Sequence, residues 1–344
     1  MTALSSTDIG RKIRKIETAL ERLSPHERHC RLCPRECGID RLSGEIGRCG
    51  TGAKAVLGGG LLHFGEEPPL SGVSDVRREG TSLPSLRRGS GTVFFSGCSL
   101  QCLFCQNHQL SWGREGRAVT DEELAEVMLD LQRQGALNIN LVTPGHVLLP
   151  ILRALKRAYG KGLALPLVYN TGGYEKASVL GELDGVVDIY LPDLKYRSPQ
   201  VSGAFSSAPD YFDHASRAVE EMRRQRPRLI LGDDGIALEG LIIRHLVLPG
   251  CVSDSLAVLE WIAERLTPSV CLSLLGQYQP VFRAPDGVRR GLTAEEYERV
   301  LEKAEALGFE EVFIQSGNFR DEDHFLPDFN RENPFSWDGG FPKP

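Results

Sequence analysis

The sequence predicts an α/β protein, a partial (β/α)6 TIM-like barrel preceded by an N-terminal cysteine-rich metal-binding segment. Three observations carry this prediction: apolar runs of strand length alternate with helical segments from residue 92 onward, the helical segments have clear start and stop signals, and seven of the nine cysteines form two groups. Buried strands that alternate with helices form parallel sheets with right-handed crossovers. We expect one region over residues 1–85 and the barrel over 86–344.

The first region contains little long periodic structure. It begins with an amphipathic helix from about Ile9 to Leu23 and continues into a Gly/Pro-rich passage over 57–72 and a polar link over 77–92. Short segments of this kind cannot bury enough apolar surface to hold themselves together, so we expect bound metal to stabilise them.

The barrel region is read from its apolar runs and from the helices between them. The runs are 92–96, 137–142, 163–170, 185–193, 241–249 and 269–276, and 310–315 is a candidate for an extra strand. The segments 120–135 and 293–308 both begin with Thr-x-x-Glu, the capping-box spacing, and both end in Gly. Two more helices are expected over 211–225 and 253–266. Reactive side chains of such barrels lie where the parallel strands end.

Composition limits the class of protein. The formal net charge is −6 and the basic residues are spread along the chain, which argues against nucleic acid as the main partner. No run of eighteen apolar residues occurs, and the N-terminus lacks the pattern of a signal peptide, so we expect a cytoplasmic protein without a membrane span. Thiols stay reduced in that compartment, so clustered cysteines indicate metal or redox chemistry.

The most informative motif is the run "GCSLQCLFCQN", which places Cys98, Cys102 and Cys105 directly after the first barrel strand. Each iron of a 4Fe–4S cube takes one terminal ligand, normally a cysteine, so three cysteines leave one iron open to an external chelator. Catalytic metal sites keep such an open position, whereas structural sites are closed. Two alternatives are a zinc site completed by His108 and a closed cluster completed by a distant cysteine. The surrounding residues favour the open site.

The same run resembles the cysteine loop of radical S-adenosylmethionine (radical SAM) enzymes, with Phe104 at the aromatic position before the last cysteine. Further matches follow in order: "VYNTGG", "YLPDLK" and "IIRHLVLPGCVSDS" resemble segments of pyruvate formate-lyase activating enzymes. With "CxLCPRxCG", "HFGEEPPLSG", "GSGTVFFSGC" and "QYQP", the chain is similar over nearly its whole length to the branch called pyruvate formate-lyase activating enzyme-like iron–sulfur proteins.

This resemblance implies a specific chemistry. S-adenosylmethionine would chelate the open iron, and an electron from a donor such as flavodoxin or ferredoxin would cleave it to methionine and a 5′-deoxyadenosyl radical that abstracts hydrogen. The protein would position and shield these species. The target is either a glycyl residue of a partner protein or a small molecule. The competing class is a non-catalytic iron–sulfur or zinc protein, for binding or electron transfer, that keeps the barrel.

The resemblance also assigns cofactor-binding residues at strand ends. Asp193 and Lys195 match a carboxylate and an ammonium near the cofactor, and Lys195 could pair with the methionine carboxylate. Arg244 is a second candidate contact for a carboxylate or ribose because it is hard to bury without an anion. Asn170 and Thr171 would line the end of the third strand. The alternative for the charged residues is an internal ion pair that braces the barrel.

The sequence departs from the family pattern in three places. "TPGH" replaces a "GGE" segment, so that Thr143 and Gly145 offer oxygens to the cofactor and His146 takes the place of the acid. Asn170 replaces an aspartate that helps to hold a monovalent cation. "GQYQP" replaces a Tyr-His pair, which leaves Gln277 or Tyr278 as a substitute contact. All three changes concern the surroundings of the cofactor and leave the cysteine loop intact.

Four thiols lie in the N-terminal group, Cys30, Cys33, Cys37 and Cys49, with the spacing C-x2-C-x3-C-x11-C. Four cysteines close either a zinc site or a second cluster such as 4Fe–4S, and spacing does not choose between them. The two remaining cysteines, Cys251 and Cys271, are expected to be buried apolar residues. In "HFGEEPPLSG", Glu66 and Glu67 are either acid/base groups facing a substrate or part of a solvated turn.

Overall fold

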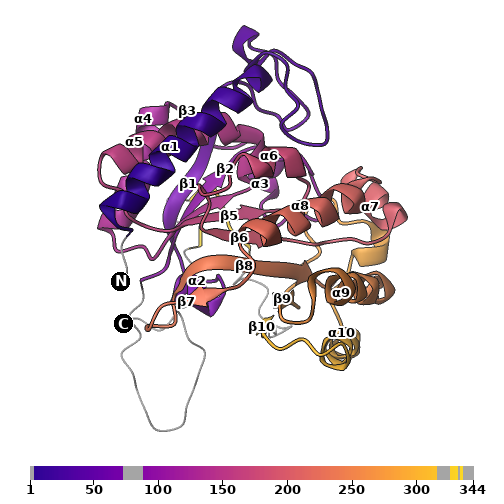
Figure 1. Cartoon of the computed structure of the whole chain (residues 1–344). Helices are drawn as coiled ribbons and strands as arrows, with labels where there is room; N and C mark the ends of the chain where they lie inside the picture. The colour runs from indigo at the N-terminus through magenta and orange to yellow at the C-terminus, as the bar shows by residue number, and fades with distance from the viewer. Residues whose placement is uncertain (1–3, 73–87, 316–325, 332–333, 336–344) are drawn as a thin grey trace.

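The computed structural model describes residues 4–72, 88–315, 326–331 and 334–335 (Figure 1). The expected boundary at 85/86 and most of the polar link lie outside these residues. Within them, no helix has both the length and the apolarity needed to cross a membrane.

Seven strands form a parallel sheet in which the strands lie in the order β2, β4, β5, β6, β8, β9, β10. Each strand therefore pairs with the next parallel strand along the chain, and the series is open between β2 and β10 in the described residues. This arrangement confirms the α/β partial barrel. The strands are β2 (Ser90–Phe95), β4 (Ile139–Val142), β5 (Leu167–Thr171), β6 (Ile189–Pro192), β8 (Ala237–Leu246), β9 (Cys271–Leu275) and β10 (Val312–Gln315).

Several of these strands are shorter than the sequence indicates, β5 and β6 most of all, and β2 and β8 start earlier. β5 begins only after Pro166, whose ring removes the backbone donor. Before β6, a turn in which Val186 N–H donates to the carbonyl of Leu183 takes up part of the expected run. β8 starts at Ala237 because the short strand β7 (Ile230–Leu231) pairs with it as a hairpin.

Besides β7, two antiparallel strands at the edge of β2 were not predicted from the sequence. β1 (Ala55–His63) pairs with the edge of β2, and β3 (Arg117–Val119) pairs with β1. Three consecutive glycines interrupt the alternation of β1, which hides the strand signal in the sequence. β1 connects the first region to the barrel through backbone hydrogen bonds within one sheet.

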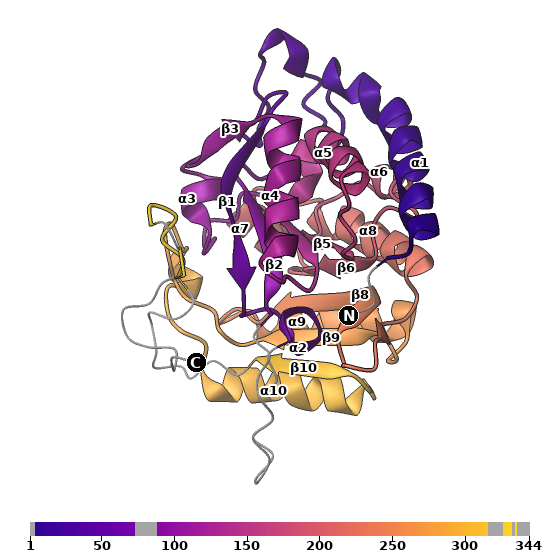
Figure 2. The same cartoon turned by 90° about the vertical axis from the view of Figure 1, so that its left-hand side faces the viewer.

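Helices cover the outer face of the sheet (Figures 1 and 2). Thr120 and Thr293 form the two expected capping boxes, at the starts of α4 and α10. The helix expected near the N-terminus is present as α1 and packs on α5. The helices are α1 (Ser6–Leu23), α2 (Pro68–Ser71), α3 (His108–Ser111), α4 (Asp121–Arg133), α5 (Leu148–Gly160), α6 (Ala177–Gly181), α7 (Pro199–Ser206), α8 (Tyr211–Gln225), α9 (Val252–Leu266) and α10 (Ala294–Ala306), with short 3-10 turns at Ser24–Glu27, Arg41–Ser43, Pro144–Val147 and Asp286–Val288.

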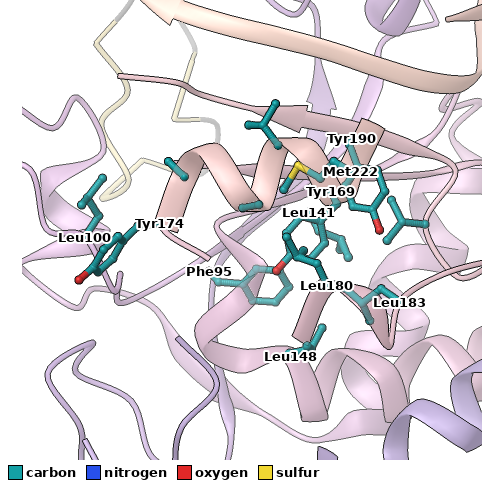
Figure 3. Packing of buried hydrophobic residues seen from close by; sticks show 14 of the residues in the cluster. Phe95, Leu100, Leu141, Leu148, Tyr169, Tyr174, Leu180, Leu183, Tyr190 and Met222 are labelled. Carbon is teal, nitrogen blue, oxygen red and sulfur yellow. The ribbon is translucent and has the colours of Figure 1, made fainter. Parts of the chain in front are cut away.

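Alternate strand residues face opposite sides of the sheet. Leu141, Tyr169 and Tyr190 face outward and belong to the main core with Leu180 of α6 and Met222 of α8 (Figure 3). Figure 3 shows the two tyrosine rings near one another, and their centroids are 6.0 Å apart. This layer fixes the strands against the helices.

The inner face of the sheet has its own small core. Leu70 of α2 is fully buried in a cluster with Val168, Ile189, Leu191 and Ile242. These strand residues alternate with the outward-facing ones, so the segment around α2 occupies the concave side of the sheet. The segment 63–72, for which the sequence left two interpretations open, therefore fills part of the barrel interior.

Candidate active site

The three cysteines of the loop after β2 line one cavity of about 600 Å³. Cys102 is buried, and Cys98 and Cys105 are partly buried. The N–H of Cys105 donates to the carbonyl of Cys102, which shapes a tight turn, and the indole N–H of Trp112 donates to the same carbonyl at 3.0 Å. The loop follows the carboxyl end of a parallel strand, where the sequence predicts reactive residues.

The N-terminal region anchors this loop from outside. Arg35 donates to the carbonyls of Ser99 and Leu100 and to those of Ser206 and Ser207. Cys98 N–H donates to the carbonyl of Cys49 at 3.1 Å. The loop backbone is thus fixed before any cofactor binds.

Burial strongly affects the loop thiols. Burial, together with the charge of the nearby Cys102, raises the pKa of Cys98 to about 12 and that of Cys105 to about 11. Buried thiols of this kind remain neutral and inert unless a cation stabilises the thiolate. The arrangement therefore suits metal binding rather than nucleophilic catalysis by a free cysteine.

Most of the predicted cofactor-binding residues lie in the same cavity. The structure brings together residues from five strand ends and the cysteine loop around it, namely Phe104, Thr143, Asn170, Thr171, Asp193, Lys195, Arg244 and Gln277. Gly145 and His146 are not among its lining residues. They lie behind the loop, in a narrow cleft that also includes Cys98, Thr143 and Glu175.

Lys195 and Asp193 form an ion pair at the wall of the cavity, with Lys195 Nζ 2.6 Å from Asp193 Oδ2. Burial alone would lower the pKa of Lys195, but the charges of Asp193 and Cys102 raise it above its ordinary value. Lys195 therefore stays cationic close to the cysteine loop. This contact is also the internal ion pair that the sequence allowed as the alternative to cofactor binding.

Arg244 has partners that the sequence did not reveal. Its Nε donates to Glu67 Oε1 at 2.7 Å, and its Nη2 donates to carboxylate oxygens of both Glu66 and Glu67. All three side chains are buried or nearly so, and Glu67 is fully buried. Glu66 and Glu67 are therefore not part of a solvated turn, and Arg244 is held by this pair of carboxylates.

Two further groups complete the network around Glu66. His63 Nδ1 lies 3.2 Å from Glu66 Oε1, and Asn140 Nδ2 donates to the same oxygen at 2.9 Å. Burial would raise the pKa of Glu66, but the charge of Arg244 and the contact with His63 hold it well below its usual range. Glu66 is ionised and lines the cavity.

The cleft behind the loop contains two titratable residues, His146 and Glu175. The sequence predicted His146 as a cofactor contact but did not indicate Glu175. His146 is buried, and its Nε2 lies 2.8 Å from the carbonyl oxygen of Ser96. Burial lowers the pKa of His146 to about 4. Glu175 accepts a hydrogen bond from Thr171 Oγ1 at 2.7 Å, and burial raises its pKa to about 7. No motif marked Glu175 because it lies two residues beyond the matched segment "VYNTGG".

Gln277 and Phe104 occupy the rim of the cavity. Gln277 Nε2 donates to Gln315 Oε1 at 2.6 Å, while Gln277 Oε1 is buried without a hydrogen-bond partner in the described part of the chain. The Phe104 ring packs edge-on against Tyr278, with centroids 5.5 Å apart. His108, which the sequence offered as a fourth metal ligand, stacks on the ring of Phe282 at 4.9 Å.

Two of the four N-terminal cysteines contact a buried guanidinium, while Cys37 is exposed. Arg41 donates through Nε to Cys30 Sγ at 3.2 Å and lies 3.7 Å from Cys49 Sγ, and it also donates to the carbonyl of Gly52. Burial would lower the pKa of Arg41, but Cys49 and Cys30 raise it. Cys33 is buried beside them, and burial raises its pKa to about 12. A buried cation favours thiolates in this group, as a metal centre requires.

No family model matches the chain. An uncharacterized protein of Methanocaldococcus jannaschii is 29% identical over 301 residues, which cover 83% of this chain and 77% of the relative.

Two solved structures are similar to the chain at a low level. One is native anSMEcpe with bound AdoMet, with a TM-score of 0.43 and 16% identity over 64% of this chain and 61% of that one. The other is Streptococcus suis SuiB bound to S-adenosylmethionine, with a TM-score of 0.41 and 11% identity over 64% and 49%. The match thus spans about three fifths or less of these structures.

Proposed function

We propose that the chain is a radical SAM enzyme that carries a 4Fe–4S cluster on Cys98, Cys102 and Cys105. The observation that carries this proposal is the convergence of these three cysteines with Asp193 and Lys195 on one cavity at the carboxyl edge of a parallel sheet. The motif resemblance described above independently supports the same three ligands.

The donor set fits an iron–sulfur cluster. Three cysteines of one loop line the same cavity, and each iron of a cube takes one terminal ligand, normally a cysteine. The neutral, buried thiols of Cys98 and Cys105 would ionise on binding iron.

When bound, the cluster supplies the electron that cleaves the sulfonium of S-adenosylmethionine and yields the radical that abstracts hydrogen. The residues of this chain hold and shield the reactants. Lys195 remains cationic and is suited to the methionine carboxylate, while Asn170 and Thr171 present polar groups at the end of β5. The rings of Phe104 and Tyr278 pack on one another and line the cavity beside the cysteine loop, where an apolar surface helps to keep water from the reactants.

For the target of the radical, we favour a small molecule over a partner protein. Pro327 and Phe335, from the C-terminal part of the chain, line the same cavity, so its walls come from several elements of this chain. A glycyl residue of a partner, as an activase-like role requires, would have to enter on an extended segment. The cavity size is within the range of sites for small ligands.

The test is anaerobic reconstitution of the full chain with iron and sulfide, followed by dithionite and S-adenosylmethionine. We expect 5′-deoxyadenosine and methionine as products, and a changed electron paramagnetic resonance (EPR) spectrum when S-adenosylmethionine is added. Cys102→Ala should lose both the loop cluster and the cleavage. Cys251→Ala is the matched control, because Cys251 lies outside the cavity at the start of α9.

A non-catalytic iron–sulfur or zinc protein predicts a different result. Such a protein would retain metal but give no 5′-deoxyadenosine, and its spectrum would not respond to S-adenosylmethionine. Cleavage that survives in Cys102→Ala would refute the ligand assignment.

A further inference from the structure

Three side chains outside the cavity, Trp112, Phe282 and Arg283, form a cluster that we call the aromatic patch. The ring centroids of Trp112 and Phe282 are 5.7 Å apart, and the guanidinium carbon of Arg283 lies 5.3 Å from the first and 4.9 Å from the second. None of these three residues lines the cavity of about 600 Å³. The chemistry proposed for the cavity therefore leaves the patch without a role.

Two hydrogen bonds join the aromatic patch to the backbone of the cysteine loop. The indole N–H of Trp112 donates to the carbonyl of Cys102 at 3.0 Å, and the backbone N–H of Arg283 donates to the carbonyl of Leu103 at 3.0 Å. The thiols of the same short segment line the cavity. The segment that would carry the cluster thus contacts the reaction space through its side chains and the aromatic patch through its backbone.

Phe282 combines exposure with a strained backbone. Its side chain is 41% exposed, and its φ of +58° lies in the left-handed region, which a bulky residue seldom adopts. The ring stacks on that of His108 with centroids 4.9 Å apart, but burial within this chain is incomplete. Strained residues of this kind are concentrated at binding sites, where the strain serves to present a side chain.

The charge of the aromatic patch is positive. Arg283 is exposed and forms no ion pair with a carboxylate in the part of the chain that the structure describes. The other charged residues on the adjoining segments balance in sign: Asp286 pairs with Arg289 at 3.1 Å, Arg290 with Glu296 at 2.7 Å and Asp328 with Arg331 at 3.2 Å, and Arg114 adjoins Glu115. In a chain with a net charge of −6, this cation offers an acidic partner a local point of attraction.

The composition of the aromatic patch suits a small, transient interface with another protein. Complexes of electron-transfer proteins are at the small end of the range of interface sizes. Aromatic and arginine side chains contribute most of the binding energy at protein interfaces. The ring of Phe282 offers an exposed face for stacking with a second aromatic system, and a flavin is such a system.

We propose that the aromatic patch is the docking site of the electron donor, an acidic flavoprotein whose flavin ring packs on Phe282 while its carboxylates meet Arg283. This inference rests on the proposed function, which needs an electron from outside the chain. In the transfer, the anionic flavin hydroquinone loses one electron and becomes the neutral semiquinone, and the oxidised cluster on the cysteine loop gains that electron. No proton or other group moves.

The experiment measures binding of oxidised bacterial flavodoxin, an acidic flavoprotein, to the reconstituted full chain by anaerobic calorimetry. We expect saturable binding that weakens as the salt concentration rises. Phe282→Asn should weaken binding about tenfold or more, because it removes the ring while asparagine tolerates the same backbone conformation. Arg283→Glu should weaken binding by about the same factor and should reduce its dependence on salt.

Two matched controls change the same kinds of side chain elsewhere. Ile46→Asn removes an apolar side chain that is 58% exposed on the N-terminal cysteine segment, the other surface at which a donor would approach a cysteine group. Arg217→Glu reverses an exposed charge on α8. Both should bind flavodoxin within about twofold of wild type. The melting temperature of each variant shows whether it is folded.

A second measurement compares two reductants in the production of 5′-deoxyadenosine. With photoreduced flavodoxin below saturation, Phe282→Asn and Arg283→Glu should be slower than wild type by about the factor lost in binding. With dithionite, a small reductant that needs no docking site, both variants should match wild type. Equal rates with flavodoxin in wild type and in both variants would contradict the inference.

The outcomes separate this inference from the proposed function. Absence of flavodoxin binding by the wild-type chain, equal binding by wild type and both patch variants, or loss of binding in Ile46→Asn alone would each overturn it. Binding that depends on the aromatic patch, without 5′-deoxyadenosine under dithionite, supports the docking site and contradicts the radical chemistry. Cleavage under dithionite without such binding does the reverse.

Discussion

The backbone N–H of Cys98 donates to the carbonyl oxygen of Cys49 at 3.1 Å, so one hydrogen bond joins the last cysteine of the N-terminal group to the first cysteine of the loop. Gly97 makes this approach feasible. Its φ is +86°, and a Cβ at this position would collide with the carbonyl of Cys49 and the methyl group of Thr51. The two cysteine groups are therefore built as one unit.

Gly97→Ala is expected to lower the free energy of unfolding by about 2–4 kcal/mol, because it combines a left-handed backbone with a backbone clash. Gly135→Ala is the matched control, since Gly135 has a φ of +92° but no atom within 4 Å of an added Cβ. It should cost only about 1 kcal/mol. Urea unfolding measures both. Iron content should fall in Gly97→Ala alone, and equal losses of stability would contradict the role of the contact.

Arg41→Met is expected to reduce metal retention by the N-terminal cysteines, because it removes the buried cation beside Cys30 and Cys49. The measurement is iron and zinc per chain in a background in which Cys98, Cys102 and Cys105 are all replaced by Ala. That background isolates the N-terminal group and also shows which metal it binds. Arg22→Met, at an exposed ion pair, is the control. Unchanged metal content in Arg41→Met would rule out the electrostatic role.

Arg244→Met should destabilise the chain by about 3–5 kcal/mol, since it leaves Glu66 and Glu67 buried without their cation. Replacement of both glutamates by Gln in the same chain should recover part of this loss, because the network is then neutral. Thermal unfolding of the single, double and triple variants measures the coupling. Additive losses would show that Arg244 acts through packing alone.

Glu175→Gln is expected to change the pH dependence of stability. The folded pKa of about 7 lies above the ordinary value of 4.5, so the folded state holds a proton that the unfolded state has released over this interval. The contribution of protonated Glu175 to the free energy of unfolding is complete below pH 4.5 and is lost as the pH rises through 7. The variant should therefore gain about 3 kcal/mol relative to wild type between these limits. If the free energy of unfolding changes with pH in the same way in the variant and in wild type, Glu175 is not a buried, protonated residue.

His146→Gln should show the opposite sign. The folded pKa of about 4 lies below the ordinary value of 6.5, so the unfolded state binds a proton first as the pH falls. The neutral buried ring then loses about 3 kcal/mol of relative stability between pH 6.5 and 4. The variant, which cannot be protonated, should lack this loss. Urea midpoints at pH 4, 5, 6 and 7 provide the test.

The sequence predicted the fold class because the signals for it are local. Apolar runs and the capping residues Thr120 and Thr293 depend only on near neighbours, and they located the main strands and two helices correctly. β1 escaped because its glycines give no alternation, and it forms only when β2 supplies the pairing edge.

The sequence predicted those site residues that belong to recognisable motifs at the ends of parallel strands. The cysteine loop and Asp193 fall on one cavity, as strand ends of a parallel sheet should. The contacts of Arg244 with Glu66 and Glu67 join positions 177 and 178 residues apart, and no local pattern reports such pairs. Glu175 was missed for a similar reason, since burial alone gives it its altered pKa.

The antiparallel pairing of β1 has a practical consequence for anyone who wishes to dissect this molecule. Every residue of β2 is buried, and β1 covers the hydrogen-bonding edge that β2 would otherwise leave bare. A shortened polypeptide that starts beyond β1 would offer this apolar edge to other molecules, which invites self-association. The two cysteine groups should therefore be separated by point substitutions in the intact polypeptide, not by trimming its beginning.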